Sequence, residues 1–108
     1  MFKSGGYNVY PREVEAAIEA HPLVDQAAVV SVEDDIWQEV GVAFVTLRGD
    51  LTADALQAHC RDRLANYKIP KSIVILEEMP LLPIGKIDKV TLARRAREEG
   101  ASDKKGPE

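Results

Sequence analysis

The spacing of apolar residues predicts a helix and two strands in the first half of the chain. Between Pro11 and Pro22 the apolar residues recur every three or four positions, as on one face of a helix. Pro11 suits the first helical turn because its missing N–H would have no partner there, and Pro22 marks the helix end. The runs 24–32 and 40–47 are rich in β-branched residues, and the polar segment 33–35 between them predicts a loop.

A second helix is expected after Thr52, which is a good N-cap residue. One face of this helix carries an apolar residue at every third or fourth position: Leu56, Cys60, Leu64 and Tyr67. Cys60 is therefore predicted to lie in the core and to take no part in chemistry. Pro70 is expected to stop the helix.

The last third of the chain predicts one strand and one helix. Residues 73–76 form a short apolar run typical of a buried strand, and a loop rich in proline and glycine follows. Asp88 is expected to cap a helix that ends at Gly100, with residues 101–108 as a disordered tail. The order of elements predicts an α+β domain over residues 1–100, with helices on a three-stranded sheet after a Gly-rich hairpin or loop.

Composition limits what the chain can do. Its 108 residues, 45% of them hydrophobic, suffice for one domain with a single core. The formal net charge of -4 gives no overall basic field, which argues against nucleic acid as a partner. The apolar stretches are too short to cross a bilayer, so no membrane insertion is expected. A single cysteine and the lack of a secretion signal favour a cytoplasmic location.

Two segments are candidates for chemistry, although each also has an ordinary structural explanation. The first contains Gly5 and Gly6, which allow backbone angles closed to other residues and let another molecule approach the main chain. A simple turn before a helix would use the same glycines.

The second segment contains Gly85 and Lys86 in a loop rich in proline. It is not a phosphate-binding P-loop, because Pro80 and Ile87 occupy the positions at which that motif needs glycine and serine or threonine. A lone lysine in such a loop is more often a solvated charge than a catalyst.

The combination of these segments with the element order resembles one known family. From Phe2 to about Arg97 the chain is similar to the C-terminal domain of the adenylate-forming superfamily, which includes acyl-CoA synthetases, adenylation domains of peptide synthetases and firefly luciferases. The resemblance rests on four motifs: SGGYNVYPREVE at 4–15, HPLV at 21–24, YKIPK at 67–71 and GKID at 85–88.

The resemblance implies a catalytic role for Lys86. Members of this family join a carboxylic acid to a thiol in two steps: the acid attacks ATP to give an acyl adenylate and pyrophosphate, and the thiol of coenzyme A then displaces AMP. A fixed cation beside the α-phosphate would screen the repulsion between the two anions. Lys86 is expected to be this cation, and Gly85 to let its loop enter the active site of a larger domain.

The resemblance also implies that the domain rotates before the second step. Gly5 and Gly6 are then expected to line the passage for the pantetheine arm of coenzyme A, because backbone without side chains suits a narrow channel. Tyr7 belongs to the same coenzyme-binding segment. Candidate contacts for the coenzyme A phosphates are Lys3, Arg12 and Lys68. Solvated surface cations are the more common explanation for such residues.

The remaining components are expected outside the chain. These are a large N-terminal domain that binds ATP and the acid, the hinge between the domains, and the ligands of Mg²⁺. The chain is therefore expected to be a fragment or an excised domain that folds but is inactive alone. The acid is expected to be a fatty acid, because residues 2–13 look most like bacterial fatty-acyl-CoA ligases. A peptide-synthetase adenylation domain is less expected, because no carrier domain follows.

Three further points complete the sequence-based picture. Gln38 stands where the family pattern leads us to expect glycine. His21, His59 and Cys60 are the only soft candidates for metal ligands, and they lack the spacing of a zinc site, so no metal site is predicted. A non-catalytic α+β module that binds a small ligand or a protein is the alternative, because composition and element order alone do not exclude it.

Overall fold

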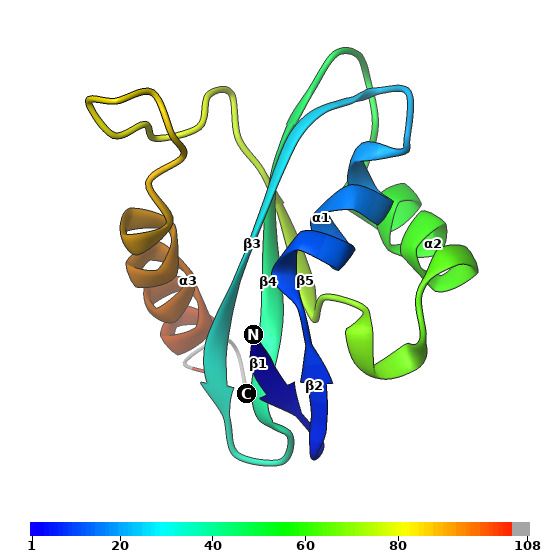
Figure 1. Ribbon diagram of the computed structural model, residues 1–108, viewed down its shortest axis with the longest axis vertical. Helices are drawn as coiled ribbons and strands as arrows, with labels where there is room; N and C mark the ends of the chain where they lie inside the picture. Colours follow the sequence, from blue (N-terminus) through cyan, green and yellow to red (C-terminus); the bar gives the residue numbers. More distant parts are fainter. Residues whose placement is uncertain (105–108) are drawn as a thin grey trace.

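The chain forms one sheet with helices on both of its faces (Figure 1). The structure is a computed structural model that describes residues 1–104, with side chains for residues 1–98. Its elements are β1 (Phe2–Ser4), β2 (Tyr7–Val9), α1 (Pro11–Glu19), β3 (Val24–Asp34), β4 (Gln38–Leu47), α2 (Ala53–Arg63), the 3₁₀ helix η1 (Asn66–Lys68), β5 (Ser72–Ile75) and α3 (Lys89–Lys104).

Strand β4 lies at the centre of the sheet. It pairs with β3 in antiparallel fashion from Val24↔Leu47 to Asp34↔Gln38. Its other edge is shared, because β5 runs parallel to residues 42–45 and β1 meets β4 at Ser4↔Gln38. The α+β class is confirmed, but the sheet has five strands and not the predicted three. The Gly-rich N-terminal segment is a β1–β2 hairpin that joins the sheet, because its Phe2 and Val9 are buried in the core.

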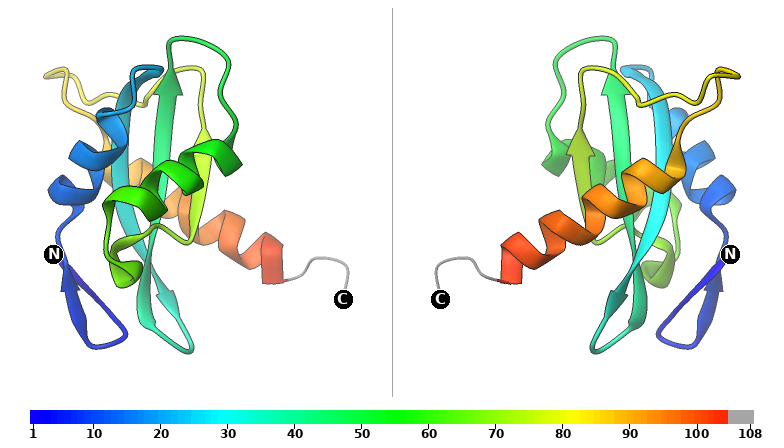
Figure 2. Two further views of the ribbon diagram at one scale, coloured as in Figure 1. Left: turned by 90° about the vertical axis from the view of Figure 1, so that its right-hand side faces the viewer. Right: turned by 90° about the vertical axis from the view of Figure 1, so that its left-hand side faces the viewer.

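The alternation of side chains along the strands builds two cores. They lie on opposite faces of the sheet, under the helices that cover each face in Figure 2. Ala27 and Val29 of β3 face the layer of α1 and α2, whereas Ala28 and Val30 face α3. The first core includes Val14, Ile18, Leu56, Cys60 and Ile73, and the second includes Phe44, Leu76, Met79, Leu92 and Ala96. The prediction that Cys60 belongs to the core is confirmed, since its side chain is fully buried.

Two predicted helix ends are wrong. The second helix stops at Arg63, and Leu64 already has extended backbone angles. Leu64 and Tyr67 still pack against the first core, but from the irregular segment that returns the chain to β5. The free energy gained by burying these two side chains therefore outweighs the hydrogen bonds that a longer helix would form. Helix α3 continues past Gly100 to Lys104. The rest of the predicted tail, residues 105–108, lies outside the described residues.

Part of the predicted loop at residues 33–35 is strand. Strand β3 extends through Asp34, because the ladder with β4 continues to the pair Asp34↔Gln38. The Asp34 carboxylate then accepts the N–H groups of Ile36 at 3.0 Å and Trp37 at 2.9 Å, which closes the turn. The turn places Trp37 beside the β1–β2 hairpin, where Gly5 donates its N–H to the Trp37 carbonyl at 2.7 Å.

Candidate functional site

Lys86 lies on a short hairpin between β5 and α3. The Leu82 N–H donates to the Lys86 carbonyl at 2.7 Å, and the Gly85 N–H donates to the Leu82 carbonyl at 2.8 Å. Gly85 has φ 91°, as expected for the glycine that ends a three-residue hairpin loop with a bulge. At the base of the hairpin, the Asp88 N–H donates to the Pro80 carbonyl at 2.9 Å. The lysine therefore starts from a hydrogen-bonded turn and not from a free loop.

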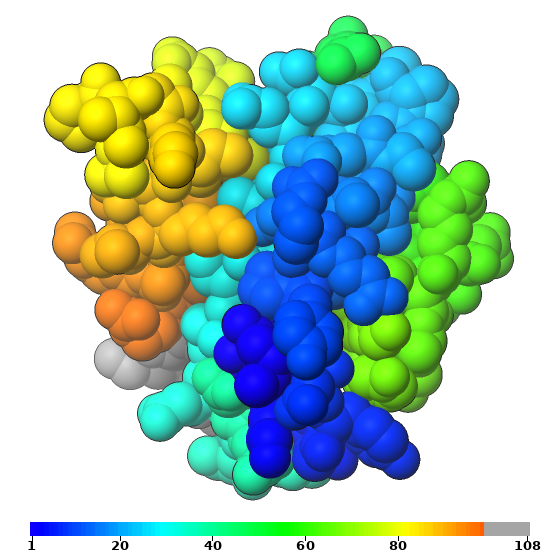
Figure 3. Space-filling model, in the orientation of Figure 1, coloured from blue at the N-terminus to red at the C-terminus, as the bar shows by residue number. Residues whose placement is uncertain are grey.

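The Lys86 side chain is exposed, and apolar residues of the same hairpin are exposed as well. Its ammonium group has no hydrogen-bond or ion-pair partner within the part of the chain that the structure describes. Leu81 is 57% exposed and Ile84, at the tip of the hairpin, is 76% exposed. In the space-filling view this hairpin projects at the upper left of the molecule (Figure 3). An unpaired cation with apolar neighbours is the composition of a surface that inserts into another protein surface.

Helix α3 begins directly after this hairpin, with Asp88 as its N-cap. The Asp88 carboxylate accepts the Thr91 N–H at 3.1 Å and the Thr91 hydroxyl at 2.8 Å. These bonds hold the pKa of Asp88 below its ordinary value, because they favour the charged carboxylate. The predicted cap at Asp88 is confirmed, and it fixes the start of the helix at Lys89, three residues after Lys86.

The predicted Gly5–Gly6 segment is the tight turn between β1 and β2. Ser4 pairs with Tyr7, and the two glycines have φ 58° and 87°, as a two-residue turn of type I′ requires. A Cβ atom on Gly5 would lie 2.7 Å from Cε3 of Trp37, whereas a Cβ on Gly6 would meet nothing within 4 Å. Gly5 is thus exposed but lies directly against the Trp37 ring, and Gly6 faces open space.

Two aromatic rings support this turn. Tyr7 is 60% exposed, and its ring stacks on Tyr67 with centroids 4.5 Å apart and an angle of 22° between the planes. The Lys68 ammonium group lies 5.6 Å from the centre of the Tyr67 ring and 2.8 Å from the Glu13 carboxylate. The hydrogen bond to Glu13 raises the pKa of Lys68. Sequence reasoning placed Tyr67 only on a helix face. Its contact with Tyr7 joins segments 60 residues apart, so no local sequence pattern could have predicted it.

The other cations predicted to contact coenzyme A differ in their contacts within the domain. Lys3 is exposed, next to the Gly turn in sequence. The Arg12 side chain is 70% exposed, yet it forms ion pairs with Glu15 at 3.2 Å and Glu19 at 2.8 Å. These carboxylates, Glu19 above all, raise the pKa of Arg12. Nothing in these contacts tests the predicted binding of coenzyme A phosphates by Lys3, Arg12 or Lys68, which stays a prediction.

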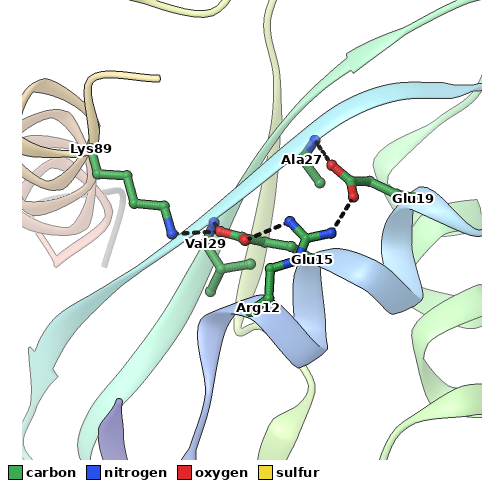
Figure 4. A network of polar contacts seen from close by, with 6 residues as sticks. All are labelled: Arg12, Glu15, Glu19, Ala27, Val29 and Lys89. Carbon is green, nitrogen blue, oxygen red and sulfur yellow. Dashed lines mark hydrogen bonds and ion pairs between the residues drawn. The ribbon is translucent and has the colours of Figure 1, made fainter. Parts of the chain in front are cut away.

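Glu15 is a notable residue that sequence reasoning did not single out. Its side chain is only 6% exposed, and Oε2 accepts the Val29 N–H at 2.9 Å and pairs with Lys89 at 2.6 Å (Figure 4). Glu19, one turn later, accepts the Ala27 N–H at 3.2 Å. The two carboxylates thus bind outward N–H groups of the edge strand β3. The available signal was the i, i+4 spacing of two acidic residues beside the apolar face of α1.

The two candidate segments lie at opposite ends of the domain. The Lys86 hairpin is at the top and the Gly5–Gly6 turn at the bottom in all three ribbon views (Figures 1 and 2). The structure therefore brings Gly5, Gly6, Tyr7 and Lys68 together and keeps them away from Gly85 and Lys86. One rigid domain cannot place both ends at one active site at the same time.

The described residues contain neither a metal-binding cluster nor a helix that could span a membrane. Among residues 1–104, no cluster of three or more His, Cys, Asp or Glu residues is arranged to hold a metal ion. The His59 Nε2 atom lies 2.7 Å from the Ala17 carbonyl oxygen. The rings of His21 and His59 meet edge-on, with their centroids 5.1 Å apart. No helix in the described part of the chain has the length and apolarity needed to cross a membrane.

Comparisons with known proteins agree on the same domain type. The family model described as the AMP-binding enzyme C-terminal domain matches residues 13–86. A 2-succinylbenzoate–CoA ligase from Geobacillus kaustophilus is 49% identical over 79 residues, covering 71% of this chain and 16% of that protein. A probable CoA ligase from Humulus lupulus is 41% identical over 103 residues, covering 92% of this chain and 18% of the relative.

A solved structure of a Mycobacterium tuberculosis fatty acyl CoA synthetase superimposes with a TM-score of 0.81 at 38% identity, covering 88% of this chain and 19% of that one. The chain thus spans less than a fifth of the length of these relatives. The motifs that suggested the adenylate-forming superfamily lie within or beside the matched region. The chain belongs to the AMP-binding enzyme C-terminal domain family of the adenylate-forming superfamily.

Proposed function

We propose that this domain is the mobile lid of an ATP-dependent acyl-CoA ligase and that Lys86 is its catalytic residue for acyl-adenylate formation. The observation that carries the proposal is the Lys86 ammonium group, which projects from a hydrogen-bonded hairpin and has no ionic partner among the residues that the structure describes. The exposed apolar side chains of Leu81 and Ile84 flank it. Such a surface supports insertion of the lysine into the cleft of the large ATP- and acid-binding domain.

In the first step a carboxylate oxygen attacks the α-phosphorus of ATP, and the bond from that phosphorus to pyrophosphate breaks. Negative charge accumulates on the α-phosphoryl oxygens and on the leaving group. A lysine ammonium group placed there donates hydrogen bonds and stabilises this charge, and it accepts no proton. Mg²⁺ would accompany ATP, with its ligands on the large domain.

In the second step the thiol of coenzyme A attacks the acyl carbonyl and AMP leaves. We assign the Gly5–Gly6 turn to the passage for the pantetheine arm. The position of this turn, at the end of the domain opposite Lys86, supports a rotation of the domain between the two steps. Gly6 suits the wall of a passage because the space beside its Cα is open.

Half-reactions of the intact enzyme test the role of Lys86. Lys86→Ala is expected to abolish pyrophosphate release from acid and ATP, while thioester formation from supplied acyl adenylate and coenzyme A continues. The matched control is Arg48→Ala, which removes an exposed cation that pairs only weakly, with Asp25 at 3.5 Å. Normal adenylation by the Lys86→Ala enzyme would refute the assignment.

Substitution in the Gly turn is expected to have the reverse effect. A bulky residue at Gly5 should block thioester formation and spare adenylation, but it would also collide with Trp37. Gly6→Val is the sharper test, because a Cβ atom at Gly6 meets no atom of the domain within 4 Å, although the positive φ of this position adds strain. An equal loss of both half-reactions in a variant with unchanged melting temperature would contradict the passage.

We assign a fatty acid as the substrate, supported by the structural similarity to a fatty acyl CoA synthetase. The relative with 49% identity is a 2-succinylbenzoate–CoA ligase, so both kinds of acid belong in the assay. Measured with the intact enzyme, kcat/KM should be higher for fatty acids of medium or long chain. A preference for 2-succinylbenzoate would overturn this part of the proposal.

A reconstitution experiment distinguishes the proposed lid from the alternative function, a non-catalytic binding module. Mixing this chain with a large domain that lacks its own lid, together with acid, ATP and coenzyme A, should restore a ligase activity that depends on Lys86. Specific binding of a small ligand or protein by the chain without any such activity would favour the module. The cytoplasmic location stays a prediction.

A further inference from the structure

Glu15 connects the two layers of the domain around the edge of the sheet. Helix α1, which carries Glu15, packs on one face, and α3, which begins with Lys89, packs on the other (Figure 2). The Glu15 carboxylate reaches past β3, where one oxygen, Oε2, accepts the Val29 N–H at 2.9 Å and contacts the Lys89 ammonium at 2.6 Å (Figure 4). The contact therefore joins α1, β3 and the first residue of α3.

The Glu15–Lys89 ion pair is short and partly buried. The Glu15 side chain is 6% exposed and the Lys89 side chain 45%, so the carboxylate is largely removed from water while the ammonium group is partly solvated. The Glu15 carboxylate has two cationic partners, Arg12 on Oε1 at 3.2 Å and Lys89 on Oε2 at 2.6 Å. Of the two, only Lys89 belongs to α3, and removing it takes the charged partner from a largely buried oxygen, which is unfavourable. Exposed ion pairs such as Arg48–Asp25, at 3.5 Å, hold their side chains far less firmly.

The Lys86 hairpin is held only at its base. Residues 81–86 are exposed, and the hairpin is closed by the Leu81↔Ile87 bridge and the Asp88–Pro80 bond. At the base, Met79 is buried in the second core and Ile87 packs against it. The direction of the exposed part therefore depends on this base and on the start of α3, where Lys89 lies only three residues after Lys86. Three extended residues span about 10 Å, so a tilt of roughly 6° at the start of α3 would move the lysine by about 1 Å. Displacements of that size are costly in catalysis.

We infer that Glu15, through its ion pair with Lys89, is a positioning residue that fixes the Lys86 hairpin for the adenylation step. The catalytic part of this inference rests on the function proposed above for Lys86. Helix α3 keeps its apolar contacts through Leu92 and Ala96 when the pair is broken, so the fold survives and the hairpin becomes less well placed. In the thioester step the opposite end of the domain acts, and the pair has no role there.

The structural part is tested on this chain by amide hydrogen exchange measured by NMR. Lys89→Met keeps the aliphatic stem and removes the charge. Exchange at the Leu82 and Asp88 amides is expected to become about tenfold faster, with no change at Phe44 in the central strand. Lys89→Arg should restore slow exchange, and Arg48→Met is the control for a lost surface pair. Unchanged exchange in the hairpin, or an equal rise at Phe44, would overturn the inference.

The catalytic part is tested in the intact enzyme. Lys89→Met is expected to lower kcat for adenylation about tenfold, with little change in the KM for ATP and none in thioester formation from supplied acyl adenylate; Lys89→Arg should recover most of the rate. Normal adenylation by Lys89→Met overturns the positioning role even if Lys86→Ala is inactive. Normal adenylation by Lys86→Ala instead refutes the proposed function, while the exchange experiment still decides whether the pair fixes the hairpin.

Discussion

Gln38 offers a quantitative test of the backbone geometry, because it has φ 75° and is the one non-glycine residue with positive φ within residues 1–104. It lies at the junction of the sheet, paired with both Asp34 and Ser4. A side chain in this left-handed region costs about 1–2 kcal/mol. Glycine avoids that cost but loses about 0.5–1 kcal/mol through the greater freedom of the unfolded chain. Gln38→Gly should therefore stabilise the domain by up to about 1.5 kcal/mol, with a central value of about 0.75 kcal/mol.

Thermal and urea unfolding followed by circular dichroism measure this gain. For a domain of this size, it corresponds to a rise in Tm of about 2–6 °C. Gln38→Ala is the control, since alanine removes the exposed side chain and keeps the strained φ, so its stability should stay within about 0.5 kcal/mol of the parent. A loss of stability in Gln38→Gly, or an equal gain in Gln38→Ala, would refute the argument from strain.

Two further predictions concern single side chains. Asp34 accepts the Trp37 and Ile36 N–H groups and pairs with Lys71 at 3.1 Å, which lowers its pKa. Its stabilising effect is therefore present above the ordinary aspartate pKa of about 3.9 and is lost as the pH falls through the lower folded value. The difference in unfolding free energy between the parent and Asp34→Asn should be largest near neutral pH and shrink toward pH 3; a constant difference would contradict the assignment. Burial raises the pKa of the Cys60 thiol, so alkylation by iodoacetamide should be at least about 100-fold slower in the native protein than in urea, and similar rates would show that the core is open.

The sequence alone determined the elements that depend on local chemistry. Pro11 and Asp88 marked helix starts because their conformational and hydrogen-bonding preferences act within one turn. The β-rich runs predicted β3 and β4 because alternating side chains must serve two cores. Motif resemblance predicted glycine at position 38, and the positive φ of Gln38 gives the physical reason.

Only the tertiary structure decided the features that depend on distant contacts. The β1–β2 hairpin became part of the sheet because Phe2 and Val9 found a core made by later elements. The second helix ended at Arg63 because the segment after it must pack Tyr67 and return to β4 as β5. Besides Arg12 on its own helix, Glu15 has partners in β3 and α3, 14 and 74 positions away in sequence. No local pattern encodes such an encounter, since it exists only once the sheet has placed all three elements at one edge.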